Sequence, residues 1–380
     1  MTEQSIPNDD NTTSETSPEW AKIEAVQNYL AKAQRQHDGG RPVEANEVLG
    51  KIQAMLAERS PETDKEPPDI ASGAIDYWAH VAKRKATVGT SLAGLDNILG
   101  GGLEPQRLMI LLGAPGGGKT TLANQIAVHA ADSGRPVFYV TSEDIPFNLL
   151  AKTLARQAQT NYTAVLKAYD DQRERIAQAL KTYQGSKAAT RLRYLDATMG
   201  TTLSTIRERA AAHFEQFKDG GSGILVVDYL QRLARSLSAY RDGKQDLRLA
   251  VTAIAEDLRS IATGLDCCVI ALAAQHRASG YGAAKNALAS GKESGDIEYT
   301  ADTVMAIGDD EQRTMQVTWL QAKVLRVDKN RQGPAGDNCI LNLDWYGERQ
   351  QFTEAFEVEN EETEDTSPFN GNGKKRGGRR

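Results

Sequence analysis

The chain has 380 residues, of which 40% are hydrophobic, and its formal net charge at pH 7 is −6. The length leaves room for one large domain with smaller appendages, and the hydrophobic fraction is sufficient for a sizeable core. The negative net charge excludes a protein coated in positive charge, so any contact with nucleic acid must be local, in a groove or a channel.

The cysteines and the hydropathy pattern indicate the compartment. Cys267 and Cys268 are adjacent inside an apolar run, which predicts reduced core residues rather than a disulfide framework. The N-terminus has no secretory signal pattern, and no apolar run approaches the roughly 18 residues of a membrane-spanning helix. We therefore expect a cytoplasmic protein that has no membrane partner.

Composition divides the chain into successive segments. Residues 1–18 are polar and predict disorder. Residues 19–59 carry two helical apolar faces around a turn and predict a small helical hairpin, and residues 60–87 combine a proline-rich linker with a further helix. Strand and helix patterns alternate over residues 88–353, which predicts an α/β domain with a mostly parallel central sheet. Residues 354–380 are acidic and then basic, and predict a disordered tail that is either merely solvated or in contact with a partner or nucleic acid.

A phosphate-binding loop is predicted at residues 113–120, which fit the pattern G-x-x-x-x-G-K-[ST]. An apolar strand at residues 107–112 precedes it and a helical pattern at 121–128 follows, and together they form an anion site. A glycine-rich turn that binds nothing is the alternative, and the correct flanks argue against it. The candidate ATP-binding residues are Gly113, Ala114, Pro115, Gly116, Gly117, Gly118, Lys119, Thr120 and Thr121.

Phosphoryl chemistry on ATP needs Mg²⁺ and an oriented water. Thr120 offers a hydroxyl to the metal, and Asp228, which ends the buried strand predicted at residues 224–228, offers a carboxylate. Lys119 is expected to contact the β and γ phosphates. The alternative for Asp228 is a polar residue that merely ends a strand.

Two further strand ends carry candidate catalytic side chains. Glu143 follows the strand predicted at residues 137–141, so it projects from the carboxyl edge of the sheet, where ligands bind in open α/β folds. It is a candidate base for the attacking water, although it could instead stabilise the N-terminus of the next helix, and its neighbour Asp144 could take its place. Gln275 follows the apolar strand predicted at residues 267–272 and is a candidate sensor of the γ phosphate.

The segment after that glutamine is glycine-rich and basic, and it contains Arg277 and Lys285. Such a loop suits contact with a sugar–phosphate backbone in a central channel, and an ordinary surface loop is the alternative.

Over about residues 70–353 the chain resembles the ATPase domain of DnaB-type replicative DNA helicases, within the wider RecA-like P-loop family. The matching blocks occur in the same order as in that family. They are residues 89–96 with 99–103, the phosphate loop, 142–144, 202–207, Asp228-Tyr229-Leu230-Gln231 with its strand, 292–298 with 301–302, and 329–336.

The resemblance implies a RecA-like core and an ATP-dependent DNA helicase that forms a homohexameric ring, moves on single-stranded DNA and unwinds duplex during DNA replication. It implies that Glu143 is the catalytic base, that Gln275 is the sensor, and that Lys329 and Arg331 reach the ATP site of a neighbouring subunit as a cationic finger. Lys292 opens the block that follows a DNA-contacting loop in the family. Loader and primase partners are also implied.

Alternatives remain open at this stage. A RecA-like DNA-binding ATPase of regulatory or recombination type, without unwinding activity, fits the phosphate loop equally well. An interaction module with a vestigial ATPase is a further alternative. The basic segment at residues 329–336 could also be a simple hairpin turn, which Gly333 and Pro334 would support.

Overall fold

The computed structural model divides the chain into two units, Met1–Lys83 and Arg84–Arg380. The structure describes residues 87–197, 201–243, 246–274, 299–310, 313 and 321–355, together with Tyr29, Val48 and Lys51. Those three isolated residues are helical, and the Lys51 ammonium lies 5.9 Å from the centroid of the Tyr29 ring. The predictions for residues 1–18, 60–86 and 356–380 lie outside the described residues.

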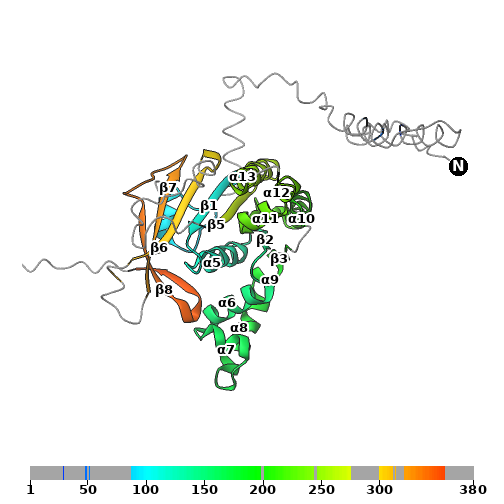
Figure 1. Ribbon diagram of the computed structural model, residues 1–380. Helices are drawn as coiled ribbons and strands as arrows, with labels where there is room; N and C mark the ends of the chain where they lie inside the picture. The colour runs from blue at the N-terminus through cyan, green and yellow to red at the C-terminus, as the bar shows by residue number, and fades with distance from the viewer. Residues whose placement is uncertain are drawn as a thin grey trace, which may run out of the picture. The chain divides into compact units, whose positions relative to one another are not determined.

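The described part of the second unit contains a nine-stranded sheet in the order β3-β2-β4-β5-β1-β6-β7-β8-β9. The strands from β3 to β6 in this order pair in parallel, and the pairs from β6 to β9 are antiparallel. The predicted α/β core with a mostly parallel sheet is therefore confirmed (Figure 1). The strands are β1 (Arg107–Gly113), β2 (Val137–Thr141), β3 (Leu192–Asp196), β4 (Ile224–Asp228), β5 (Cys268–Ala274), β6 (Thr303–Asp309), β7 (Gln321–Asn330), β8 (Ile340–Tyr346) and β9 (Gln351–Glu354).

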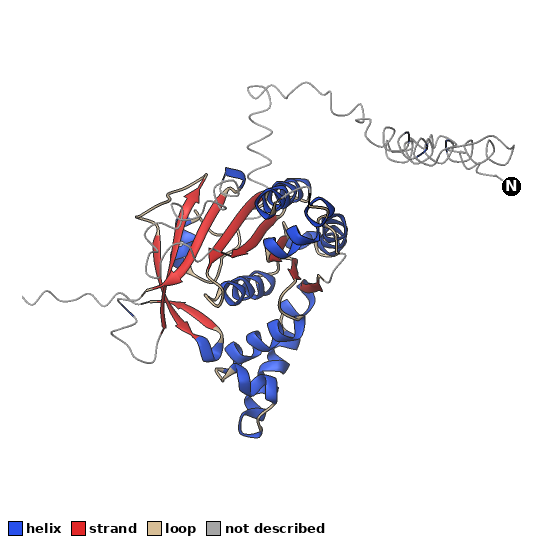
Figure 2. Cartoon of the chain, in the orientation of Figure 1, coloured by secondary structure: helices blue, strands red, loops and turns tan. Residues whose placement is uncertain are grey.

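Helices cover both faces of the parallel strands (Figure 2). The α-helices in the described part of the chain are α4 (Ala93–Ile98), α5 (Lys119–Asp132), α6 (Pro146–Ala158), α7 (Tyr162–Lys167), α8 (Arg173–Gly185), α9 (Ala188–Arg191), α10 (Leu203–Glu215), α11 (Leu230–Ser236), α12 (Ser238–Arg241) and α13 (Leu247–Gly264). None of the helices in these ranges is long and apolar enough to cross a membrane. Helices α6 to α9 lie between β2 and β3 in the chain and project beyond the sheet (Figure 1).

The residues of β1 show how the two faces are built. Met109 and Leu111 belong to an apolar cluster with Leu122 of α5, whereas Leu108 and Ile110 belong to a second cluster that includes α10 and α13. Successive side chains of a strand point to opposite faces, so a strand that is covered on both sides must be apolar throughout. The same reason explains the fully buried β2 and β4, whose predicted bounds are confirmed.

Within residues 88–355, the other helix and strand predictions that fall on described residues agree with the structure apart from their ends. The strand after α13 was predicted to start at residue 267; it begins one residue later, at Cys268, and ends at Ala274. The helix after the glycine-rich loop begins at Lys119, and Pro146 occupies the first turn of α6, as expected. Cys267, Cys268 and Cys339 are buried free thiols, and burial raises the pKa of Cys267 to about 12. Such thiols are unreactive core residues.

Candidate nucleotide-binding site

The glycine-rich loop joins the end of β1 to the start of α5. Gly116 and Gly118 have φ angles of 76° and 94°, in the left-handed region that favours glycine. A Cβ atom on Gly118 would also lie 2.6 Å from Cζ of Phe352 on β9. The loop therefore needs glycine here both for its curvature and for the approach of a neighbouring ring. The 14-residue helix α5 begins where the loop ends, so the N-terminus of the helix points at the loop, as an anion site requires.

Lys119 lies folded over this loop. Its ammonium donates hydrogen bonds to the carbonyl oxygens of Gly113 and Ala114, at 2.8 and 2.9 Å. Burial lowers the pKa of Lys119, and the charges of Asp228 and Glu143 oppose that shift. Lys119, the predicted phosphate contact, is therefore close enough to the predicted acidic residues Asp228 and Glu143 for their charges to affect its pKa.

Asp228 ends β4 with its side chain almost fully buried. Its Oδ2 accepts a hydrogen bond of 3.0 Å from the hydroxyl of Tyr139 on β2. Burial raises the pKa of Asp228, and hydrogen bonds from Thr120 and Tyr139 counteract that rise. The structure thus brings Thr120 and Asp228 together. A hydroxyl and a carboxylate are hard oxygen donors that fit Mg²⁺.

Glu143 and Asp144 are separated clearly by their surroundings. The Oδ1 of Asp144 accepts from the amide of Asn148, and Oδ2 accepts from the ammonium of Lys152, each at 2.6 Å. Both partners belong to α6, so Asp144 anchors that helix to the end of β2. The side chain of Glu143 is exposed at the carboxyl edge of the sheet, and its charge acts on Lys119 and Asp228.

The last antiparallel strand, β9, and the turn before it pack against α5. The hydroxyl of Thr121 donates to Oε1 of Gln350 at 2.9 Å, and Gln125 exchanges hydrogen bonds with the backbone of Phe352. Trp345 stacks on Phe352 with ring centroids 4.3 Å apart. The Thr121 side chain is thereby directed into the protein, which leaves its backbone N–H, in the first turn of α5, as the group that Thr121 can offer to a phosphate.

Lys329 and Arg331 lie at the opposite end of the sheet. The end of β7 pairs with Thr303 at the start of β6, and Thr303 pairs with Met109 near the start of β1. The backbone N–H of Arg331 donates to the carbonyl of Asp302, whose own N–H donates to Leu108. From Leu108 to the phosphate loop is roughly 17 Å of strand. The structure thus brings the two basic residues together but holds them away from the loop of their own chain.

The remaining candidates lie outside the described residues: Gln275, Arg277, Lys285 and Lys292. The strand end that precedes Gln275 is described, and Gln231 holds it. The Gln231 amide donates to the carbonyl of Ala274 at 3.1 Å and accepts from its N–H at 3.2 Å. Gln231 therefore fixes the last described residue before the predicted sensor.

The family model of the DnaB-like helicase C terminal domain matches residues 87–354. The chain belongs to this family.

Two curated relatives and a solved structure give the extent of the similarity. The replicative DNA helicase DnaB of Pasteurella multocida (strain Pm70) is 30% identical over 245 residues, which cover 62% of this chain and 49% of that relative. The DnaB of Buchnera aphidicola subsp. Schizaphis graminum (strain Sg) is 25% identical over 332 residues, which cover 84% of this chain and 69% of that relative. The chain thus spans about half of the first relative and about two thirds of the second.

The solved structure is described as a DnaB-like replicative helicase and its interactions with primase. It has a TM-score of 0.63 and an identity of 18%, and the match covers 88% of this chain and 77% of that one. At this identity the similarity concerns the fold, and it confirms the predicted RecA-like core.

Within the DnaB-like domain, sequence reasoning missed the side chains that support the site. Tyr139 holds Asp228, Gln231 holds the end of β5, and Gln350 binds Thr121. Tyr139 lies within a strand whose other residues are buried and apolar or small. A buried tyrosine hydroxyl needs a hydrogen-bond partner, and this need was the one signal in the sequence that could have indicated its role. The two glutamines carry no local pattern that identifies their partners.

Proposed function

We propose that this chain is an ATP-driven DNA helicase that forms a ring of six subunits, moves on single-stranded DNA and unwinds duplex during DNA replication. The observation that carries the proposal is the division of the candidate machinery between the two ends of one sheet, in a chain of the DnaB-like family. A phosphate loop at one end and a cationic pair at the other form a complete site only when two subunits meet.

The loop half of the site binds and orients ATP. The backbone N–H groups available in the loop (Pro115 has none) and the ammonium of Lys119 would hold the phosphates, and Thr120 and Asp228 would hold Mg²⁺. The metal supplies charge neutralisation on the phosphate oxygens. Tyr139 keeps the Asp228 carboxylate in place through its hydrogen bond of 3.0 Å.

Glu143 acts as the base that orients and deprotonates the attacking water. Its side chain is exposed, so water can reach it at the carboxyl edge of the sheet. Its charge raises the pKa of both Lys119 and Asp228. Asp144 is excluded from this role in the proposal because Asn148 and Lys152 already bind both of its oxygens.

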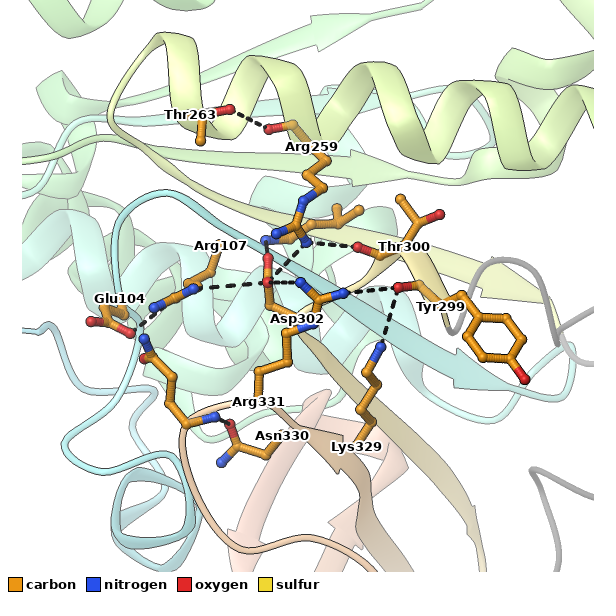
Figure 3. A network of polar contacts seen from close by, with 12 residues as sticks. Glu104, Arg107, Arg259, Thr263, Tyr299, Thr300, Asp302, Lys329, Asn330 and Arg331 are labelled. Carbon is orange, nitrogen blue, oxygen red and sulfur yellow. Dashed lines mark hydrogen bonds and ion pairs between the residues drawn. The ribbon is translucent and has the colours of Figure 1, made fainter. Parts of the chain in front are cut away.

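Lys329 and Arg331 complete the site of the adjacent subunit. A guanidinium is a planar cation that suits the charge developing on transferring phosphoryl oxygens. Both residues donate to the carbonyl oxygen of Tyr299, at 3.3 and 3.0 Å, so they form one unit (Figure 3).

The DNA-facing part of the proposal concerns Gln275, Arg277, Lys285 and Lys292. Gln275 would sense the γ phosphate and pass its loss to the basic segment that contacts single-stranded DNA. A loader and a primase are proposed partners, and the similar helicase structure is described together with primase interactions. This function places the protein in the cytoplasm, with the replicating DNA.

A strand-displacement assay combined with DNA-stimulated ATP turnover tests the proposal, with Lys119→Ala as the inactive control. Unwinding that depends on ATP is the expected result. Turnover stimulated by DNA without unwinding would instead favour a regulatory or recombination-type ATPase, and the absence of turnover would favour a vestigial site.

A further inference from the structure

A buried carboxylate at the end of the sheet far from the phosphate loop meets three guanidinium groups (Figure 3). It belongs to Asp302, whose side chain is 2% exposed and lies directly before β6. Its Oδ1 lies 2.8 Å from NH1 of Arg259, 3.4 Å from NH1 of Arg331 and 3.8 Å from NH1 of Arg107. These arginines come from α13, from the turn after β7 and from the start of β1.

The two oxygens of Asp302 have different partners. Oδ2 accepts the backbone N–H of Leu108 at 3.0 Å, while Oδ1 faces the arginines. The backbone of Asp302 donates to the Leu108 carbonyl and accepts from the Arg331 N–H. Hydrogen bonds on both sides therefore fix the carboxylate relative to β1, and with it the direction in which Oδ1 points.

One carboxylate cannot neutralise three guanidinium groups. Glu104 takes a share of Arg107 through an ion pair of 3.2 Å, and among the residues that the structure describes the cluster still has more cations than anions. Arg331 has the most exposed side chain of the three, at 43%, against 35% for Arg259 and 27% for Arg107. Arg331 is therefore held at the rim of the cluster, where a second anion can approach it.

The Arg331 guanidinium is held at two points. NH1 contacts Oδ1 of Asp302, and NH2 donates to the carbonyl oxygen of Tyr299 at 3.0 Å. These contacts use only part of the donor set of a guanidinium, so the group can be held and still donate to phosphate oxygens. An arginine that is oriented beforehand loses less conformational freedom when it meets its target.

We propose that Asp302 is a positioning residue for the cationic finger: its carboxylate, fixed against β1 and shared with Arg107 and Arg259, orients Arg331 toward the ATP of the neighbouring subunit. This inference rests on the proposed function, because it assumes that Arg331 acts in the adjacent site. Asp302 itself does not touch the nucleotide. Its effect on turnover passes through the arginine.

The test is a double-mutant cycle on the kcat of DNA-stimulated ATP turnover, measured on the full-length assembled protein. Asp302→Asn removes the charge that holds Arg331, while its amide oxygen can still accept the Leu108 N–H. We expect kcat to fall about 10- to 100-fold, because small misplacements of a catalytic group have effects of this size. In an Arg331→Ala background the same substitution should have little further effect, since the group through which it acts is gone.

Two measurements separate positioning from a purely structural role. Binding of a fluorescent ATP analogue by the phosphate loop, at the other end of the sheet, should stay within about twofold of the wild type for Asp302→Asn. Asp344→Asn is the matched control: it removes a carboxylate that pairs with a different arginine, Arg313, at 3.0 Å, so it should lower the Tm while leaving kcat within about threefold. Should Asp302→Asn fail to fold, Asp302→Glu keeps the charge but displaces it, and the same cycle applies.

Wild-type kcat in a folded Asp302 variant would overturn the inference, as would a loss that multiplies with the loss caused by Arg331→Ala. A different result bears on the proposed function instead. Undiminished turnover in the Arg331→Ala protein itself would mean that the finger role is wrong.

Discussion

Glu143 and Asp144 form a matched pair for separating catalysis from stability. Glu143→Gln removes the proposed base from an exposed position, so we expect the free energy of unfolding to change by no more than about 0.5 kcal/mol. The kcat of ATP turnover should fall about 10²- to 10⁴-fold, which corresponds to about 3 to 5 kcal/mol of activation free energy. Binding of an ATP analogue should be retained.

Asp144→Asn should show the opposite pattern. It removes an ion pair of 2.6 Å with Lys152, in which the two side chains are 20% and 12% exposed. A charged hydrogen bond in such a sheltered position stabilises the fold by about 1.5 to 3 kcal/mol, so the Tm should fall by several degrees, roughly 3 to 12 °C. Turnover below the Tm should remain near the wild-type rate.

Steady-state ATP hydrolysis and thermal unfolding of both variants check this pair of expectations. Normal turnover in Glu143→Gln, together with a large loss in Asp144→Asn, would refute the reasoning and assign the base to Asp144.

Two further predictions concern the loop and the fold. Gly118→Ala should weaken binding of an ATP analogue and destabilise the fold by about 1 to 3 kcal/mol, because φ is 94° and the new Cβ would press on Phe352. Gly185→Ala is the control, because an added Cβ there meets nothing within 4 Å. Equal effects of the two substitutions would contradict the argument. Burial lowers the pKa of His213, so the unfolded chain binds a proton more readily than the folded protein, and stability should fall as the pH drops through about 6.5. His213→Gln should flatten that dependence of Tm on pH, and parallel curves for the two proteins would contradict it.

The parallel core was predictable because its signals are local. The strands that end at Gly113, Thr141 and Asp228 are buried on both faces, so each is a continuous apolar run. A phosphate loop has a fixed spacing, which made Lys119 and Thr120 identifiable by number. The finger role of Lys329 and Arg331 was predicted only through the family resemblance of their sequence block.

The antiparallel half was not predictable in the same way. Strand β7 buries Lys323 and Arg326, whose charges hide its character in a hydropathy pattern, and each is paired with an aspartate. Arg331 lies far from the phosphate loop because of the order of the strands in the sheet, and the local sequence does not specify that order. The convergence of three arginines on Asp302 is a tertiary arrangement of the same kind. The anchoring of Asp144 had a local signal, since Asn148 follows it at a helical spacing of four residues.

The central claim is that each ATP site is shared by two subunits, and mixing two inactive proteins tests it most directly. Arg331→Ala retains the loop and lacks the finger, whereas Lys119→Ala retains the finger and lacks the loop. In random equimolar rings, about a quarter of the interfaces combine an intact loop with an intact finger, so turnover should recover to at most about a quarter of the wild-type rate. Mixing Arg331→Ala with the double variant Lys119→Ala/Arg331→Ala, which lacks every finger, should give no recovery. Absence of recovery at every ratio in the first mixture, with subunit exchange demonstrated by energy transfer between labelled chains, would contradict the account.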